Sequence, residues 1–307
     1  MERTSEITFT DVSVEVPNYS QDFYKDNYTQ LYEEGFTKHV RLKPTRYHPA
    51  FAHFLTDSII GISLEYYGEY TEQEINLLRN FLHKDCVVYD IGANIGYHTN
   101  AFAKFAKHVY AFEPNELNYK LLEINTFDDR NVTLYDYAIS NDIGVTQIEK
   151  FELGKLGNYG ECRITEDGQL CDMTYIDYLV RTKTIEPPHV IKIDVEGHEW
   201  PVFEGMSETI KNHLPVIFYE AMHCDLVSIY DMLTGLGYTL YYFPCPNYNP
   251  NNFYKNKQNI FGEGGVLNIL AIPFHVDAKT NLPKVISRDD TWANAIERIK
   301  QANAAKN

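Results

Sequence analysis

The sequence has little of what marks disulfide-stabilised, zinc-binding or membrane-spanning proteins. Its 307 residues include five cysteines, an odd number scattered without a C-x-x-C pair, which indicates neither a disulfide framework nor a zinc site. No apolar run approaches the length needed to cross a membrane, and the first residues, MERTSEITFT, lack the basic start and apolar core of a signal peptide. We therefore expect a cytoplasmic protein without membrane association.

Basic side chains are also scarce. The chain has 27 Lys and Arg against 43 Asp and Glu, and its formal net charge at pH 7 is -16. A broad surface for nucleic acid or for an anionic membrane needs positive charge, so the composition argues against both partners. The length suits one large α/β domain with additions and allows a substantial core.

The stretch from Cys86 to Pro114, CVVYDIGANIGYHTNAFAKFAKHVYAFEP, is typical of a nucleotide-cofactor site. A short apolar strand that contains Asp90 leads directly into a loop from Gly92 to Gly96, where glycine lets the backbone approach a ligand. A helix over 97–107 would point its free N–H groups at the same space. Glu113 ends a second strand about twenty residues past the loop, where such folds place a carboxylate on ribose hydroxyls.

The glycine spacing distinguishes between cofactors. A dinucleotide fingerprint is G-x-G-x-x-G, whereas this loop reads G-x-N-x-G, with Asn94 at its third position. Asp90, two residues before the loop, suits a ligand with an amino group and a sulfonium better than a diphosphate. A nicotinamide-dependent oxidoreductase is therefore disfavoured, and a nucleoside-type cofactor is expected.

A third strand over 132–137 completes a βαβαβ half. Ligands of doubly wound sheets lie beyond the carboxyl ends of the strands, so Ala138 and Ile139 are placed to border a flat ring such as adenine, or else to pack in the core. The loop over 154–160, GKLGNYG, is either a turn close to this site or a plain surface loop.

A second informative stretch, VIKIDVEGHEWPVFEGM over 190–206, gathers ionisable groups at the end of a buried strand. Asp194, Glu196 and His198 would meet on the same rim as the glycine loop if the sheet is parallel. The next predicted strand covers 214–219, and Glu220 follows it directly. These four side chains, together with His223 three residues after Glu220, are candidates for acid–base chemistry.

The roles within this group stay open. His198 titrates nearest neutrality, which favours it as a base, but a histidine at a strand end is commonly a hydrogen-bonded structural residue. Glu196 could instead orient substrate hydroxyls or cap the following helix. Asp194, Glu220 and His223 could alternatively collect a divalent ion that polarises vicinal hydroxyls.

Caps and periodicity predict the remaining elements. TEQE over 71–74 has the form of a capping box, and Asp225 is placed to cap a later helix. Strands over 238–243 and 267–272 flank a loop too long to be a mere connection. Its Asn-rich part, from Asn247 to Asn259, would suit a lid or a binding loop.

Taken together, these motifs resemble the FkbM family of methyltransferases. The resemblance depends on DIGANIGYHT, AFEPN, IKIDVEGHEWPVFEGM and the late NILAIP, and it covers about residues 66–274. The pairing of D-x-G-A-N-x-G with K-x-D-V-E-G-x-E is its most specific part. Residues 1 to about 60 and the Asn-rich loop have no counterpart in it.

The resemblance implies a class I methyltransferase fold, an α/β doubly wound and mostly parallel seven-stranded sheet. The expected divisions are an N-terminal extension over 1–65, the methyltransferase domain over 66–274, and a C-terminal helix and tail over 275–307. The implied cofactor is S-adenosylmethionine. The residues expected to bind it are Asp90, Gly92, Ala93, Asn94, Gly96, Glu113, Pro114, Ala138, Ile139 and Asp194.

The implied reaction is methylation of a hydroxyl of a sugar, a glycan or a sugar-containing small molecule. The expected catalytic residues are Asp194, Glu196, His198 and Glu220, and a divalent metal is left open. Tyr248 or Tyr254 could stack on a sugar face, or else pack the long loop down. The alternatives are a cofactor-binding protein without catalysis, and a methyltransferase acting on a nitrogen or carboxyl acceptor.

Overall fold

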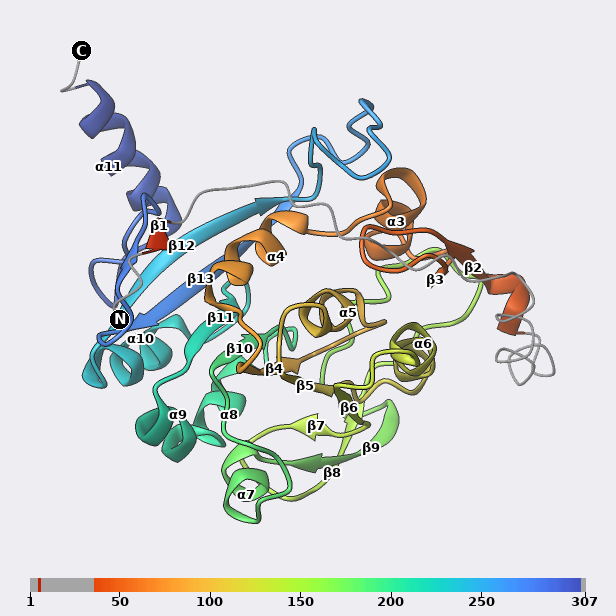
Figure 1. Ribbon diagram of the computed structural model, residues 1–307, viewed down its shortest axis with the longest axis horizontal. Coiled ribbons are helices and arrows are strands. Elements are labelled where there is room, and N and C mark those ends of the chain that lie inside the picture. Colours follow the sequence, from red (N-terminus) through yellow and green to blue (C-terminus); the bar gives the residue numbers. More distant parts are fainter. Residues whose placement is uncertain (1–4, 7–35, 305–307) are drawn as a thin grey trace.

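A computed structural model describes residues 5–6 and 36–304. Its centre is a seven-stranded sheet in the order β12-β13-β11-β10-β4-β5-β6 (Figure 1). The strands are β4 (Val87–Ile91), β5 (His108–Phe112), β6 (Val132–Tyr135), β10 (Val190–Ile193), β11 (Val216–Glu220), β12 (Tyr238–Pro246) and β13 (Gly265–Pro273). Neighbours from β11 to β6 are parallel, whereas β13 is antiparallel to both β11 and β12. This mostly parallel sheet with an antiparallel edge is the class I methyltransferase fold, which confirms the predicted fold class.

Helices cover both faces of the sheet because its central strands are apolar on both sides. In β11, Ile217 and Tyr219 pack against one group of helices, while Val216 and Phe218 face the other. On the first side lie α7 (Ile176–Arg181), α8 (Glu199–Glu204), α9 (Ser207–His213) and α10 (Leu226–Gly235). On the second side lie α4 (Glu72–Leu78), α5 (Tyr97–Ala103) and α6 (Glu116–Thr126) (Figure 1).

Smaller elements surround this core. A three-stranded sheet joins β7 (Ala138–Ile139), β9 (Gln169–Thr174) and β8 (Gly144–Ile148), and a hairpin joins β2 (Val40–Lys43) to β3 (Phe51–Phe54). The rest are β1 (Ser5–Glu6) paired with β14 (Ala278–Lys279), α3 (Ile60–Tyr67), α11 (Trp292–Ala304), and the 3₁₀ turns Phe36–His39 and Arg79–Phe81.

The five cysteines are free thiols, as the absence of a framework predicts. Within the described residues, no helix is long and apolar enough to cross a membrane.

Several predicted boundaries differ from the structure. The helix predicted over 97–107 ends at Ala103, and the strand predicted over 132–137 ends at Tyr135. The segment TYIDYLV over 174–180 also predicts a short helix, but the helix begins only at Ile176, because Thr174 is the last residue of β9. The two edge strands are longer than predicted and reduce the long loop to 247–264.

The capping box predicted at TEQE is wrong. Thr71 precedes α4 with a φ of 41° and makes no capping hydrogen bond; its Oγ1 lies 3.2 Å from Nε2 of His98 on α5. Glu74 pairs with the same histidine ring at 3.2 Å and accepts a hydrogen bond from Asn268 on β13. Both side chains are therefore used for tertiary contacts. The predicted cap at Asp225 is confirmed, since its carboxylate accepts a hydrogen bond from the Ser228 N–H.

The hairpin β2–β3 and α3 pack beside the glycine loop. The Asn125 side chain on α6 pairs with both backbone groups of Ala52 on β3, and also donates to the Ile95 carbonyl in the loop. This buried amide fixes the hairpin against the loop. Residues 1–4 and 7–35 of the expected N-terminal extension lie outside the described residues, and its boundary at residue 65 stays a prediction.

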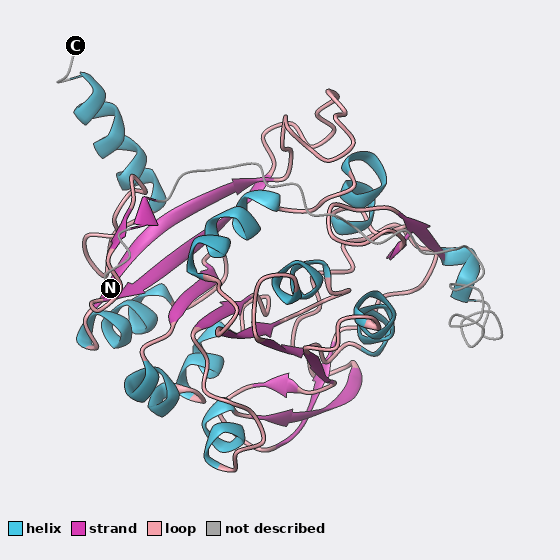
Figure 2. Ribbon diagram, in the orientation of Figure 1, coloured by secondary structure: helices cyan, strands magenta, loops and turns pink. Residues whose placement is uncertain are grey.

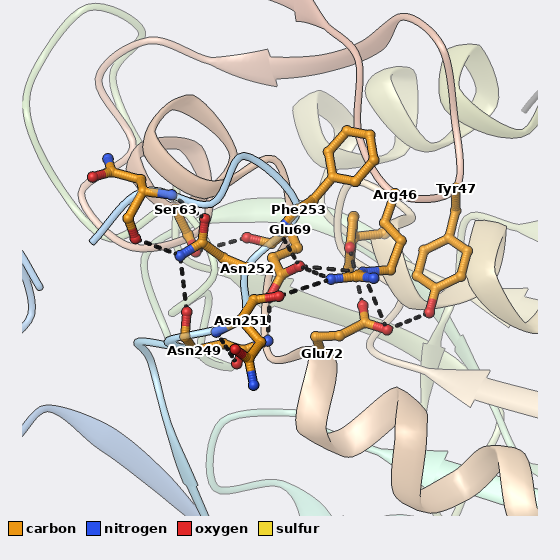
Figure 3. Close-up of polar contacts among 11 residues, drawn as sticks. Arg46, Tyr47, Ser63, Glu69, Glu72, Asn249, Asn251, Asn252 and Phe253 are labelled. Carbon is orange, nitrogen blue, oxygen red and sulfur yellow. Dashed lines mark hydrogen bonds and ion pairs between the residues drawn. The ribbon is translucent and has the colours of Figure 1, made fainter. Parts of the chain in front are cut away.

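The long loop over 247–264 stands at the end of the two edge strands (Figure 2) and is anchored by a buried ionic network (Figure 3). Glu69 accepts hydrogen bonds from the Asn249 side chain at 2.7 Å and from the Phe253 N–H at 2.8 Å. Arg46 binds Glu69 at 2.6 Å and Glu72 at 3.5 Å. The loop is therefore held to Arg46 and to the segment over 69–72.

Candidate active site

The glycine loop between β4 and α5 is shaped by close backbone packing. Gly92 has a φ of 80°, and a Cβ there would lie 1.8 Å from the carbonyl oxygen of Asp194 at the end of β10. The N–H groups of Gly92 and Ala93 donate to the Phe112 carbonyl of β5 at 3.0 and 2.9 Å. The loop is thus fixed between its two neighbouring strands, and only glycine fits at residue 92.

The G-x-N-x-G pattern has a local explanation. Asn94 has a φ of 51° and Gly96 a φ of 88°. Asparagine tolerates the left-handed region better than most residues, so it can replace a glycine at this position. At Gly96 a Cβ would lie 2.7 Å from Leu122 on α6, so the glycine also allows close helix packing.

A cavity of about 270 Å³ opens at the carboxyl ends of the parallel strands, where doubly wound folds bind ligands. Eight of the ten residues expected to bind the cofactor line it: Gly92, Ala93, Asn94, Glu113, Pro114, Ala138, Ile139 and Asp194. Asp90 and Gly96 are not on its wall.

Asp90 lies beneath the loop, fully buried. Its Oδ2 accepts a hydrogen bond from Thr99 at 2.6 Å, and its Oδ1 lies 3.8 Å from the Lys192 ammonium. The Asp90 side chain supports the loop from below, and its expected contact with a cofactor stays a prediction.

Glu113 joins the glycine loop to the cavity wall. Its Oε2 accepts a hydrogen bond from the Asn94 N–H at 2.8 Å and its Oε1 from the Asn115 N–H at 2.9 Å. Burial raises the pKa of Glu113 to about 7, although both N–H groups act in the opposite direction. A carboxylate of this kind, held by backbone groups, can accept hydrogen bonds from ribose hydroxyls.

Another part of the cavity wall is apolar. Ala138 and Ile139 of β7 are buried, and Tyr137, Ile148 and Ile164 line the same part of the cavity. Apolar groups around a flat space fit an aromatic ring such as adenine. Asn158 and Gly160 also line the cavity, so the loop over 154–160 is a turn close to the site.

The carboxylates expected at the strand ends do meet. Asp194 follows β10, Glu196 is two residues further on, and Glu220 is the last residue of β11. One oxygen of each lies within 4.8 Å of the others. His223, which the sequence also suggested, is exposed and lines the cavity outside this group.

The electrostatics of this acidic cluster (Asp194, Glu196 and Glu220) depend on one buried cation. Burial and the charge of Asp194 raise the pKa of both Glu196 and Glu220. The Lys192 ammonium donates to Asp194 at 3.1 Å. Burial by itself would lower the pKa of Lys192, but Asp194 and Asp90 outweigh it and raise that pKa, so the ammonium stays charged.

His198 lines the cavity beside the acidic cluster. Its Nε2 lies 2.9 Å from the hydroxyl oxygen of Ser140, and burial lowers its pKa, so the ring is neutral at pH 7. The histidine is thus hydrogen-bonded in the turn between β10 and α8, and its role as a base stays a prediction.

Sequence reasoning missed several residues on the cavity wall. Tyr70, His98, Lys192 and Asn247 line it. Lys192 had a signal, since it is the first residue of the K-x-D-V-E-G-x-E motif. His98 also had one, since it belongs to DIGANIGYHT, and Asn247 begins the Asn-rich loop, whereas Tyr70 comes from a segment whose sequence pattern gives no sign of the site.

Comparison with known proteins identifies the central part of the chain. Residues 90–240 match the family model of the methyltransferase FkbM domain. The chain contains an FkbM methyltransferase domain. The resemblance seen in the motifs is thereby confirmed. The FkbM domain includes both the glycine loop and the acidic cluster, whereas Tyr70, Asn247 and the other wall residues before 90 and after 240 lie outside the match.

Hexuronic acid methyltransferase AglP of Haloferax volcanii is 31% identical to the chain over 142 residues, which are 45% of this chain and 57% of that protein. The chain therefore matches little more than half the length of this relative.

The FkbM domain also has neighbours among solved structures. The methyltransferase FkbM from Methylobacillus flagellatus is 16% identical, with a TM-score of 0.40 over 61% of this chain and 44% of that one. A precorrin-6y C5,15-methyltransferase from Geobacter metallireducens is 16% identical, with a TM-score of 0.41 over 66% and 87% of the two chains. The sheet order, and not these superpositions, establishes the fold.

Proposed function

We propose that this protein transfers a methyl group from S-adenosylmethionine to a hydroxyl oxygen of a sugar, a glycan or a sugar-containing small molecule. The observation on which the proposal depends is one cavity that combines a ribose-binding type of carboxylate, Glu113, with an acidic cluster at the ends of β10 and β11. The FkbM domain and the similarity to a hexuronic acid methyltransferase support the reaction class and a sugar acceptor.

The residues present fit S-adenosylmethionine at one end of the cavity. Gly92, Ala93 and Asn94 offer close backbone for its methionine part, Glu113 offers acceptors to its ribose, and Ala138 with Ile139 border its adenine. The acidic cluster would then face the positively charged sulfur, with Asp194 nearest the glycine loop.

When bound, S-adenosylmethionine supplies a methyl group whose bond to sulfur breaks, with the electron pair staying on sulfur, as the acceptor oxygen bonds to the methyl carbon. The protein aligns the acceptor hydroxyl and excludes water from it. The hydroxyl proton must leave as the new bond forms, and we assign it to an oxygen of the acidic cluster. His198, held by Ser140, keeps the wall of this space in place.

Calorimetric titration with S-adenosylmethionine and S-adenosylhomocysteine tests the donor site. We expect micromolar binding in the native chain and at least tenfold weaker binding in Glu113→Ala, because the ribose loses its acceptor. Glu116→Gln, whose side chain is exposed on α6, is the matched control and should bind like the native chain. Absence of binding in the native chain would overturn the proposed function.

The alternative is a protein that binds the cofactor but catalyses no reaction. A screen of acceptors distinguishes it from a methyltransferase. Methyl transfer from labelled S-adenosylmethionine should be assayed on a panel of hexoses, hexuronic acids and their glycosides. Cofactor binding without turnover on any acceptor, in a chain that is folded by circular dichroism, would favour the silent alternative.

A second candidate function is methylation of a carboxylate, because the AglP relative is named for a hexuronic acid, which offers both hydroxyl and carboxylate oxygens. A carboxylate needs no base, and the acidic cluster would repel it, so we favour the hydroxyl. The products differ in chemistry: a methyl ester is cleaved by mild alkali, whereas a methyl ether survives. Loss of the label on alkaline treatment would establish the second candidate.

A further inference from the structure

The acidic cluster has the spacing of a metal site. One oxygen each from Asp194, Glu196 and Glu220 lie within 4.8 Å of one another. Oxygens that share a divalent ion at about 2.1–2.4 Å are separated by roughly 3–5 Å, depending on whether they are adjacent or opposite. The three carboxylates can therefore coordinate one ion without large movement of the two strands that carry them.

Glu220 gives an independent indication of a missing partner. Its side chain is buried, with 8% of the residue exposed, and it lines the cavity. Its Oε2 is buried and has no hydrogen-bond partner among the described residues. A buried carboxylate oxygen without a partner is costly, so a cation that came from outside the chain would stabilise this atom.

Nearby Glu199 differs in the use of its other oxygen. It too is buried with one unpaired oxygen, but its Oε1 accepts hydrogen bonds from the N–H groups of Val195 and Gly197. Glu199 therefore shapes the turn after β10. It is not part of the group of carboxylates whose oxygens converge.

The charge around the acidic cluster is unbalanced. The nearest described cation is the Lys192 ammonium, 3.1 Å from Asp194 and 3.8 Å from Asp90, so its charge is divided between two carboxylates. When all three carboxyl groups are ionised, the shared Lys192 ammonium and the Arg163 guanidinium, whose charge acts on Glu196, leave negative charges unbalanced in a partly buried place. A divalent cation would balance them.

We propose that Asp194, Glu196 and Glu220 bind one hard divalent cation, Mg²⁺, Mn²⁺ or Ca²⁺, whose remaining coordination positions face the cavity. All three ligands are carboxylates, which favours hard cations over zinc or copper. The ion-binding site depends only on these residues, whereas its role toward an acceptor rests on the proposed function.

In that role the ion selects acceptors with two neighbouring oxygens. Three protein ligands leave two or more positions for oxygens of the acceptor or water. A pair of vicinal hydroxyls, or a hydroxyl next to a carboxylate, can chelate the ion, and chelation fixes which oxygen lies next to the methyl donor. The ion also makes a bound hydroxyl more acidic, so a cluster oxygen removes its proton more readily.

Mn²⁺ binding, followed by electron paramagnetic resonance on chelator-treated protein in saturating S-adenosylhomocysteine, tests the proposal. We expect one Mn²⁺ per native chain, displaced by Mg²⁺ or Ca²⁺, and at least tenfold weaker binding in Asp194→Asn and Glu220→Gln. Glu116→Gln makes the same charge change on the surface and should bind Mn²⁺ like the native chain. If Glu220→Gln does not fold, Glu196→Gln on the partly exposed turn replaces it.

The outcomes separate the two proposals. Native chain that binds S-adenosylhomocysteine but no Mn²⁺ at millimolar concentration overturns the cation site and leaves the proposed function intact. Mn²⁺ bound equally by native chain and Asp194→Asn also overturns it. Mn²⁺ binding that depends on the cluster, in a chain that binds neither S-adenosylmethionine nor S-adenosylhomocysteine, supports the cation site and removes the proposed function.

Discussion

Gly92 is the residue at which the site is least tolerant of change. Its absent side chain lets the loop touch the Asp194 carbonyl, and through that contact the donor end of the cavity is joined to the acidic cluster. Close packing therefore explains the first glycine of D-x-G-A-N-x-G, in addition to the proposed contact with a ligand. Any Cβ at this position must push β10 and the loop apart.

Gly92→Ala should abolish cofactor binding, and Gly262→Ala is its control. Both glycines have positive φ, 80° and 58°, so both variants have the strain of the left-handed region, about 1–2 kcal/mol. At Gly262 a Cβ meets nothing within 4 Å, whereas at Gly92 it meets the Asp194 carbonyl. We expect urea unfolding to show a loss of roughly 3 kcal/mol or more for Gly92→Ala, from strain plus overpacking.

For Gly262→Ala we expect the free energy of unfolding to fall only by the backbone strain of about 1–2 kcal/mol. Its calorimetric affinity for S-adenosylhomocysteine should be unchanged. Equal losses in the two variants would mean that the close contact at Gly92 relaxes without cost.

At the scale of single residues, the sequence predicted the donor side of the site better than the acceptor side. Glu113 and the glycines lie within a short continuous motif whose order of elements is fixed by chain connectivity. Tyr70 and Asn247 reach the cavity from segments outside this motif, and His98 lies just after its glycines, where the pattern does not give the direction of the side chain. Their positions depend on tertiary packing, such as the contact of His98 with Thr71 and Glu74, which no local pattern specifies.

At the scale of elements, the loop over 247–264 is packed against its neighbours. Tyr248 packs on Tyr67 with ring centroids 5.4 Å apart, and the Tyr254 hydroxyl donates to the Pro44 carbonyl. Neither tyrosine lines the cavity, so the described contacts favour packing over the stacking of a sugar. The part of the loop that reaches the cavity is Asn247, next to the end of β12.

Arg46→Met should loosen this loop and destabilise the protein. The Arg46 side chain is 13% exposed, and its partners Glu69 and Glu72 are 3% and 2% exposed (Figure 3). Removing the cation leaves two buried carboxylates without a counter-ion, which costs about 3–5 kcal/mol. Urea unfolding should show this loss, and trypsin should cut faster after Lys255 and Lys257 in the released loop.

Arg41→Met is the matched control. Its ion pair with Glu65 joins side chains that are 51% and 26% exposed, and such pairs contribute less than about 1 kcal/mol. Tryptic cleavage at Lys255 and Lys257 should stay at the native rate. A similar acceleration in both variants would show that the network around Glu69 does not hold the loop.

The TEQE segment shows why element prediction has limits. A capping box is a local rule, and the segment satisfies it in sequence, but Thr71 and Glu74 are both drawn to His98. Tertiary hydrogen bonds outcompeted the local one. By contrast, the parallel strands were predicted well because burial on both faces requires uninterrupted apolar runs, as in β10 and β11.

At the scale of the whole molecule, some of the many acidic residues are buried. Glu72, Glu113 and Glu220 are buried, in a chain whose formal net charge is -16. Burial raises the pKa of Glu72 to about 8, because desolvation outweighs the charge of Arg46. Such groups bind protons more readily in the folded than in the unfolded chain, so they make stability depend on pH.

The contribution of Glu113 to this pH dependence of stability can be measured separately. Its pKa is about 7 in the folded, ligand-free chain and 4.5 in an exposed reference. Between these values the folded chain binds more protons than the unfolded chain, so the free energy of unfolding falls as pH rises.

The variant Glu113→Gln cannot titrate at this position but keeps an oxygen for the Asn94 N–H. Urea unfolding of both chains from pH 5 to 8, with chelator and no cofactor, cancels every other titration in their difference. We expect the native chain to lose about 2.5 kcal/mol of unfolding free energy relative to the variant across this range, at roughly 1.4 kcal/mol per unit of pKa shift. A constant difference would mean that Glu113 ionises normally inside the ligand-free cavity, and that its burial is relieved by water.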